Sequence, residues 1–319
     1  MRTPHERDIV FLDFEICSEP SYAGKYHLSY FISKVQELVN DGVSDYWNKK
    51  RTNKTYIRKI DVDNHNNCVK FLLCYTDSTV PGIPVADIDT NTQRNEKLTQ
   101  REGSPHTAHL IIKLTPIVSN PNIYEGFLEE GERLKRNDVE KYFNFLFRTI
   151  KTKYPDDFLM NAIDGSVDES GKVTKDRYSN SFNIQGKLSK DFQRILQEGR
   201  ILGLTLVSDQ VSSLGIGNGY SIQPRRKEIS LVSNSGPLSL LTNAIQTACH
   251  IGKDVNYESL RINFSNGKKL SSSVTINTQN QNVVGDGFLR KERLGFSIPL
   301  IEAEEDFNNT ILEKMLELL

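Results

Sequence analysis

The sequence lacks the features that mark secreted, metal-binding or membrane-spanning proteins. Its four cysteines, Cys17, Cys68, Cys74 and Cys249, lie far apart, and none belongs to a C-x-x-C pair. This spacing is not that of a zinc ribbon, a redox dithiol or a small disulfide-rich domain. The segment Met1–Asp8 is charged and lacks the apolar core of a signal peptide. No apolar run reaches the roughly 20 residues that span a bilayer. We therefore expect a cytoplasmic protein that does not insert into a membrane.

The chain also lacks an excess of charge of either sign. Its 40 lysines and arginines are balanced by 41 aspartates and glutamates, so the formal net charge is −1. A nucleic-acid site, if present, must therefore come from cations that cluster locally. The 15 phenylalanines and 12 tyrosines are enough to build a core and argue against a disordered chain.

Apolar residues of the first half recur at the periods of strands and helices. In residues 8–17 they occupy both faces of a predicted strand, so we expect both faces to be covered: Val10, Leu12, Phe14 and Ile16 on one, Ile9 and Phe11 on the other. A helix is predicted over 22–47, and a second begins near Asn137 and ends at Tyr154-Pro155. The remaining predictions are strands near 55–62, 69–76 and 108–115, a loop over 90–107 and a hairpin over 164–180.

The second half has a similar mixture of predicted elements. Helices are predicted near 189–198, from Pro237 to about His250, and over 303–319. Strands are predicted at 200–208, 227–233, 259–265, 272–278 and 294–300. Because the strands follow one another as meanders, we expect the α+β class, with mixed or antiparallel sheets and packed helices. We expect two lobes, an N-terminal one over 1–155 and a C-terminal one over 156–319.

Several motifs suggest chemistry without supporting it. His106 and His109 lie three apart on a predicted strand, so their rings should point to opposite faces and not share a metal. Asp87 and Asp89 could face the same side of a strand, as in a metal-dependent nuclease, but a turn explains them equally simply. The run Gly215–Gly219 has neither the Lys-Ser/Thr of a P-loop nor a helix behind it. We expect no metal site, no cofactor and no catalytic residue.

Two clusters of cations are better candidates. Lys49, Lys50, Arg51 and Lys54 lie within the segment 46–59, beside Tyr46, Trp47 and Tyr56. Cations interleaved with aromatic rings can bind the phosphates of a nucleic acid and pack on its sugars or bases. The simpler interpretation of this segment is a solvated helix end followed by a turn. The second cluster, Arg225, Arg226 and Lys227, follows the glycine-rich run and Pro224, where two guanidinium groups could each bind a phosphate.

The order of several short motifs resembles the RexA-type phage-exclusion proteins. The residues that carry the resemblance are Lys70–Cys74, Glu102-Gly103, His109–Lys113, Tyr124–Leu128, the helix from Asp138, and Ile222–Ile229. The chain looks longer than the usual member of that family around 160–180 and 265–290. The resemblance implies a two-lobed homodimer that binds double-stranded DNA with little sequence preference. It also implies a role in phage defence beside a membrane-protein partner.

The sequence therefore favours a binding protein over an enzyme. The leading hypothesis is a sequence-tolerant double-stranded DNA-binding protein of phage defence or superinfection exclusion. Two alternatives stay open: a metal-dependent nuclease that uses Asp87 and Asp89, and a protein-interaction subunit that does not bind nucleic acid.

Overall fold

The structure is a computed structural model that describes most of the chain. It describes residues 4–319 except 81, 87–88, 100–101, 132, 188, 190–200, 209–213, 218–219, 223–226, 232–246, 250, 253, 256, 258, 266–270, 279–282 and 285–288. The chain divides into two compact units, Met1–Ile184 with Glu292–Leu319, and Gln185–Lys291. Each unit is described by itself. Helices and mostly antiparallel strands make up the described residues, which confirms the α+β class. The two-lobe division at residue 155 stays a prediction.

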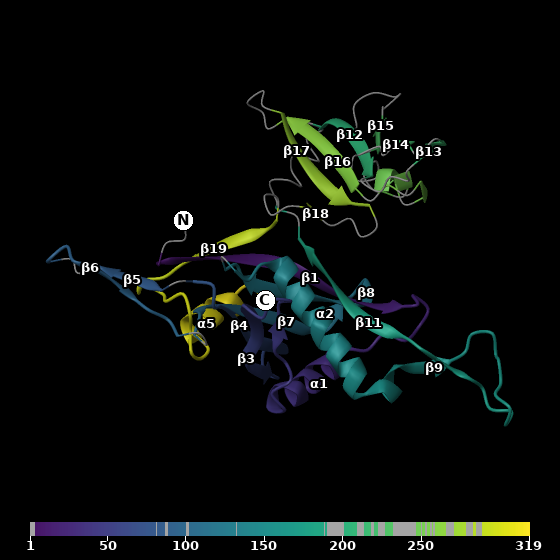
Figure 1. Cartoon of the computed structure of the whole chain (residues 1–319), viewed down its shortest axis with the longest axis horizontal. Coiled ribbons are helices and arrows are strands. Elements are labelled where there is room, and N and C mark those ends of the chain that lie inside the picture. The colour runs from purple at the N-terminus through teal and green to yellow at the C-terminus, as the bar shows by residue number, and fades with distance from the viewer. Residues whose placement is uncertain are drawn as a thin grey trace. The chain divides into compact units, whose positions relative to one another are not determined.

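An eight-stranded sheet forms the centre of the first unit (Figure 1). Its order is β11-β1-β8-β7-β4-β3-β2, and β19 also pairs with β1. The neighbouring pairs from β1 to β2 along this order are antiparallel. The bounds are β1 Glu6–Glu19, β2 Tyr46–Trp47, β3 Asn53–Asp63, β4 Cys68–Asp77, β7 Ser104–Ile117, β8 Asn120–Glu129, β11 Ser179–Gly186 and β19 Lys291–Gly295.

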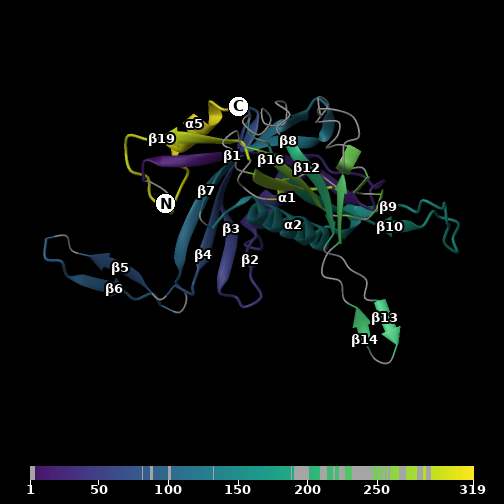
Figure 2. The same ribbon diagram turned by 90° about the horizontal axis from the view of Figure 1, so that it is seen from above.

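Both faces of this sheet are buried, as the alternation in β1 predicted. Phe14 of β1 packs with Phe143 of helix α2 (Arg136–Lys153) on one face. On the other face, Ile9 and Phe11 join a buried cluster with Ile311, Leu312 and Met315 of helix α5 (Asn309–Leu316). In Figure 2, α5 and the longer helices lie on opposite sides of the sheet. Strand residues i and i+2 share a face, so one strand supplies both cores.

The first helix is shorter than the sequence predicted. Helix α1 spans Leu28–Asn40, so the prediction of a helix over 22–47 is wrong at both ends. The chain leaves the helix at Asp41 and Gly42, where Gly42 has a φ of 69°, a conformation that glycine adopts without a steric cost. The Val43 N–H then donates to the Leu38 carbonyl oxygen at 3.0 Å. Residues 46–47 are consequently free to pair with β3 as strand β2.

Helix α2 agrees with its prediction. Its N-terminus is stabilised by the Asp138 carboxylate, which accepts a hydrogen bond from the Lys135 N–H at 3.2 Å. The helix ends before Pro155, where the short 3-10 helix η1 (Pro155–Phe158) begins. The predicted hairpin over 164–180 is present as β9 (Leu159–Asn161) paired with β10 (Lys175–Arg177). Its connection projects from the end of α2 in Figures 1 and 2.

The segment between β4 and β7 is not the loop that the sequence predicted over 90–107. It contains a two-stranded hairpin, β5 (Ile83–Ala86) with β6 (Gln93–Glu96), and β7 already begins at Ser104. Figures 1 and 2 show this hairpin extending away from the large sheet. All four residues of β6 are exposed. Periodicity could not identify β6, because a strand without a buried face has no apolar alternation.

The second unit contains a five-stranded sheet in the order β15-β12-β16-β17-β18. Its strands are β12 Ile201–Ser208, β15 Lys227–Leu231, β16 Ser259–Ser265, β17 Ser271–Asn277 and β18 Val283–Val284, and all pairs are antiparallel. A separate hairpin joins β13 (Leu214–Gly217) to β14 (Tyr220–Ile222). One face of the sheet carries the buried residues Leu204, Leu206, Leu260, Ile262 and Ile276.

The predictions for the second half are met in part. The strands at 200–208, 227–233, 259–265 and 272–278 are confirmed, whereas the strand predicted at 294–300 is β19, which ends at Gly295. The terminal helix begins at Asn309, six residues later than predicted, because the Asn308 side chain accepts from the Thr310 and Ile311 N–H groups. The helix predicted at 189–198 and most of the helix predicted from Pro237 lie outside the described residues. Among the residues that are described, no helix is both long and apolar enough to cross a membrane.

Candidate nucleic-acid interface

The turn between β2 and β3 carries three of the predicted DNA-binding cations. Asn48 organises this turn, because its side-chain oxygen accepts from the Thr52 N–H at 2.9 Å and its carbonyl oxygen accepts from the Arg51 N–H at 3.0 Å. Arg51 adopts a left-handed conformation with φ 56°. Lys49, Lys50 and Arg51 are exposed, and within the described part of the chain none of them forms an ion pair. The turn therefore holds three uncompensated positive charges at the edge of the sheet.

A row of alternating cations and aromatic rings continues from this turn along β3. Lys54 lies opposite Trp47 in the strand pairing, and its Nζ lies 4.2 Å from the ring centroid of Tyr56 and 5.6 Å from that of Trp47. The Arg58 guanidinium donates to the Tyr56 hydroxyl at 3.3 Å. Trp47, the only tryptophan, is 45% exposed. Rings and cations that share one surface can contact both the phosphates and the sugars of a nucleic acid.

Acidic side chains compensate the inner part of this row. Lys54 forms an ion pair with Asp45 at 3.1 Å, and Lys59 is paired with Asp306 and lies over the Phe307 ring. Lys54 was predicted to bind DNA, but its charge is already paired within the protein. The free charge of the segment is thus concentrated at the turn. We call Lys49, Lys50, Arg51 and Trp47 the β2–β3 tip.

The second predicted cluster cannot be assembled from the described residues. Arg225 and Arg226 lie outside them. Lys227 is the first residue of β15 and lies opposite Ser208 of β12. The neighbouring Glu228 forms a 3.5 Å ion pair with Arg261 of β16. The DNA-binding role of all three cations stays a prediction.

The motifs that suggested metal chemistry do not form a site among the described residues. His106 and His109 point to opposite faces of β7, as predicted: His106 lies near Tyr75, and His109 is fully buried beside Glu129. Asp89 lies in the exposed turn between β5 and β6, and Asp87 is outside the described residues. Across the described chain, no group of three or more histidine, cysteine, aspartate or glutamate side chains could hold a metal ion.

The thiols of two cysteines are held in their protonated form. Burial, assisted by the nearby carboxylate of Glu15, raises the pKa of Cys17 to about 11. Burial, assisted by Asp63, raises the pKa of Cys68 to about 11 as well. A nucleophilic cysteine needs a lowered pKa, so neither thiol is suited to covalent catalysis.

Sequence patterns missed a buried ionic network, which we call the Arg7–Glu129–His109 network. The Arg7 guanidinium lies 3.0 Å from one Glu129 oxygen, and the His109 Nδ1 lies 2.7 Å from the other. The His109 Nε2 accepts from the Asn308 N–H at 3.0 Å, and Arg7 donates to the Ile301 carbonyl oxygen at 3.1 Å. Both ring nitrogens of His109 are therefore occupied. The network anchors the segment before α5 and leaves no imidazole nitrogen free for acid–base chemistry.

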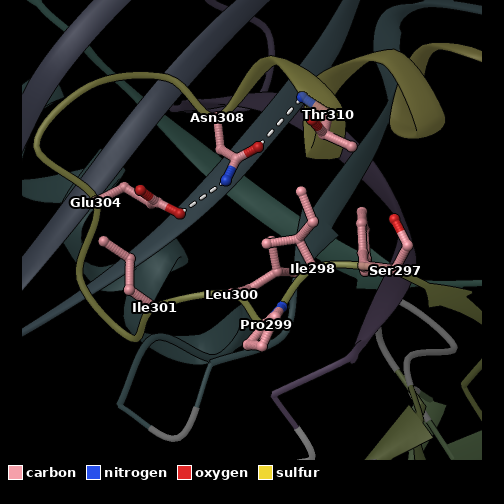
Figure 3. A pocket seen from close by; sticks show the side chains of 9 residues that line it. Ser297, Ile298, Pro299, Leu300, Ile301, Glu304, Asn308 and Thr310 are labelled. Carbon is pink, nitrogen blue, oxygen red and sulfur yellow. Dashed lines mark hydrogen bonds between the residues drawn. The ribbon is translucent and has the colours of Figure 1, made fainter.

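An apolar pocket of about 340 Å³ lies along the same C-terminal segment (Figure 3). Ile298 and Ile301 on its rim are 73% and 60% exposed. Its polar side is formed by Glu304 and Asn308, whose side chains are hydrogen-bonded to each other at 2.8 Å. The pocket has no cation and no unpaired polar side chain suited to nucleic acid. It differs in chemistry from the β2–β3 tip.

Comparison of the chain with protein-family models and with curated proteins gives no match. The geometry of the described residues is therefore the basis for the functional proposals that follow.

Proposed function

We propose that the protein binds double-stranded DNA with little sequence preference, and that the β2–β3 tip contacts the DNA backbone. The observation that carries the proposal is the set of exposed, uncompensated cations at Lys49, Lys50 and Arg51 beside the exposed ring of Trp47. Phosphate contacts from such side chains position a protein on DNA without reading its sequence. The proposal agrees with the near-neutral chain, because only a local cluster could supply the attraction.

The exposed edge of the sheet supports this placement. Strand β2 is two residues long and ends the sheet order, so the tip is not covered by another strand. The Asn48 hydrogen bonds hold the turn in one conformation, which lowers the entropy lost when the side chains bind. Lys54, although paired with Asp45, keeps Trp47 and Tyr56 together as one surface.

A charge-removal variant tests the proposal. Lys49→Gln with Lys50→Gln and Arg51→Gln should weaken binding to unrelated duplexes by about tenfold or more, since each lost phosphate contact also reduces the salt slope by about 0.9. A control with the same charge change replaces Lys25, Lys97 and Lys172 by glutamine, at sites away from the tip. Fluorescence anisotropy over a salt series measures both quantities. Equal binding by both variants, with melting temperatures like the parent's, contradicts the proposal.

The two alternatives are separated by incubating the protein with plasmid DNA, with and without magnesium. Retarded, intact plasmid supports the binding protein, whereas cleavage that needs magnesium supports the nuclease. Asp87→Ala with Asp89→Ala should leave retardation unchanged in the first case and abolish cleavage in the second. A protein that neither retards nor cleaves plasmid supports the interaction subunit.

The homodimer, the membrane-protein partner and the role in phage defence are proposals that rest on the resemblance to RexA-type proteins. Arg225, Arg226 and Lys227 are proposed as a second DNA contact on the same basis and from their sequence context. Light scattering of the purified chain tests the dimer. Phage plating on cells that express the parent or the tip variant tests whether defence requires DNA binding.

A further inference from the structure

A pocket of about 430 Å³ lies at the C-terminal end of α2 and is lined by Arg148, Lys151, Thr152, Pro155 and Arg177. Three of these five residues are cations, and no acidic residue lines the pocket. We propose that this pocket is a phosphate-binding site, distinct from the β2–β3 tip. Its volume is within the range of about 300–1,000 Å³ that is usual for small-molecule sites.

The three cations are brought together by two separate elements. Arg148 and Lys151 are three residues apart on α2, so they lie on the same side of the helix, one turn apart. Arg177 comes from β10, where it pairs with Leu159 of β9 immediately after η1. Pro155 begins η1 and turns the chain away from α2, so that β9 and β10 return beside the end of the helix.

These cations are not used by the fold, unlike their neighbour Lys153. Lys153 is paired with Asp41 and lies 5.3 Å from the ring centroid of Tyr154, so it stabilises the contact between α2 and α1. In the part of the chain that the structure describes, Arg148, Lys151 and Arg177 have no ion pair and no side-chain hydrogen bond. Cations at a helix C-terminus stabilise the helix, which accounts for Lys151. Arg148 lies more than one turn from that end, and Arg177 is not on the helix, so the helix alone does not explain the cluster.

The acidic residues nearest in sequence do not neutralise the pocket. The Asp157 carboxylate accepts from the Tyr30 hydroxyl at 2.6 Å, and the Asp157 carbonyl oxygen accepts from Tyr178 at 3.1 Å. Asp176 is next to Arg177 on β10, so its side chain points to the opposite face of the strand. Asp156 is exposed in η1 and does not line the pocket. Three positive charges with no counter-ion in the pocket favour a ligand group that carries more than one negative charge.

The phosphate could belong to a small molecule or to a DNA backbone, and two probes distinguish these sources. The first probe is inorganic pyrophosphate, measured by titration calorimetry. The second is a short DNA duplex, measured by anisotropy at low salt. The site variant replaces Arg148, Lys151 and Arg177 by glutamine, which keeps polar side chains and removes the charge. The matched control is Lys153→Gln on the same helix, and the variant of the β2–β3 tip is the second control.

We expect the site variant to lose about tenfold or more in affinity for at least one probe, because charge-assisted contacts to phosphate are lost. Lys153→Gln should bind both probes like the parent. A loss for pyrophosphate that the tip variant does not share supports a small-molecule site. A loss for the duplex alone supports a DNA contact. Since the pyrophosphate result does not depend on the tip, failure of one proposal can be distinguished from failure of the other.

The proposal is overturned if the parent binds neither probe, or if the site variant, folded as judged by circular dichroism and melting temperature, binds both like the parent. Equal weakening by Lys153→Gln and the site variant also overturns it, because general charge would then account for the effect.

Discussion

One face of the eight-stranded sheet is covered by α1 and α2 through aromatic rings, whereas the other is covered by the C-terminal segment through hydrogen bonds and buried charges. On the first face, Phe143 lies 5.4–6.1 Å from the ring centroids of Phe14, Phe31, Phe71 and Phe182. On the second, the Arg7–Glu129–His109 network lies beside the apolar cluster of α5.

The two faces should therefore fail in different ways. Apolar packing is not directional, so damage to the α2 face should lower the stability of the whole unit. The contacts from the network are directional and few, and they end on the backbone of Ile301 and Asn308. Damage there should also release the C-terminal segment locally.

Phe143→Ala should have the largest effect. The side chain is fully buried, and its removal leaves a cavity among four rings, so we expect a loss of about 3–5 kcal/mol in the free energy of unfolding. Chemical denaturation measures this loss. Phe145→Ala is the control, because Phe145 is half-buried on the same helix and should cost clearly less. Equal losses for the two variants would mean that the α2 face is not the main core.

Glu129→Gln should cost nearly as much and differ in kind. Breaking a buried ion pair by removing one partner costs about 3–5 kcal/mol, since the Arg7 charge stays buried without its counter-ion. In addition, hydrogen exchange of the Glu304 and Asn308 amides should accelerate more than that of the α2 amides. Uniform acceleration across the first unit would remove the distinction between the two faces.

Asp63→Asn should have a smaller effect that depends on pH. Hydrogen bonds from Lys70 at 2.6 Å and from Asn66 hold the pKa of Asp63 well below its usual range. Because this pKa is lower in the folded than in the unfolded chain, acid protonates the unfolded state first, and the stabilisation is lost as the pH falls below about 4. We expect the variant to be about 1–3 kcal/mol less stable at neutral pH.

The measurement for Asp63 is a series of denaturation curves across pH. The difference between parent and variant should be constant above about pH 5 and should narrow below about pH 4. A difference that stays unchanged down to acidic pH would show that the carboxylate charge does not contribute.

Lys59→Met should have the smallest effect, about 0–1 kcal/mol, because both members of the Lys59–Asp306 pair are largely exposed. Methionine keeps an apolar contact to Phe307, so the loss of charge is isolated. Thermal unfolding at low and high salt measures the effect, which should vanish at high salt. A large, salt-independent loss would place this exposed pair among the elements that hold the C-terminal segment.

The sequence alone determined the elements whose residues interact with near neighbours. Val139, Phe143, Leu146 and Ile150 recur at the period of one helix face, and all are buried in α2. The alternation in β1 predicted that both faces of the sheet are covered. The basic segment at 49–54 could be found from composition, because clustered charge is visible without a fold.

Only the tertiary structure decided which charges are free. Lys54 and Lys59 look like Lys49 and Lys50 in the sequence, but Asp45 and Asp306 compensate them. Asp306 is 247 residues from Lys59, and Arg177 is 29 residues from Arg148, so neither meeting has a sequence period. The same holds for Arg7 with Glu129. Periodicity describes contacts within one helix or strand, whereas the neighbours of a charge depend on which strands pair and where the chain returns.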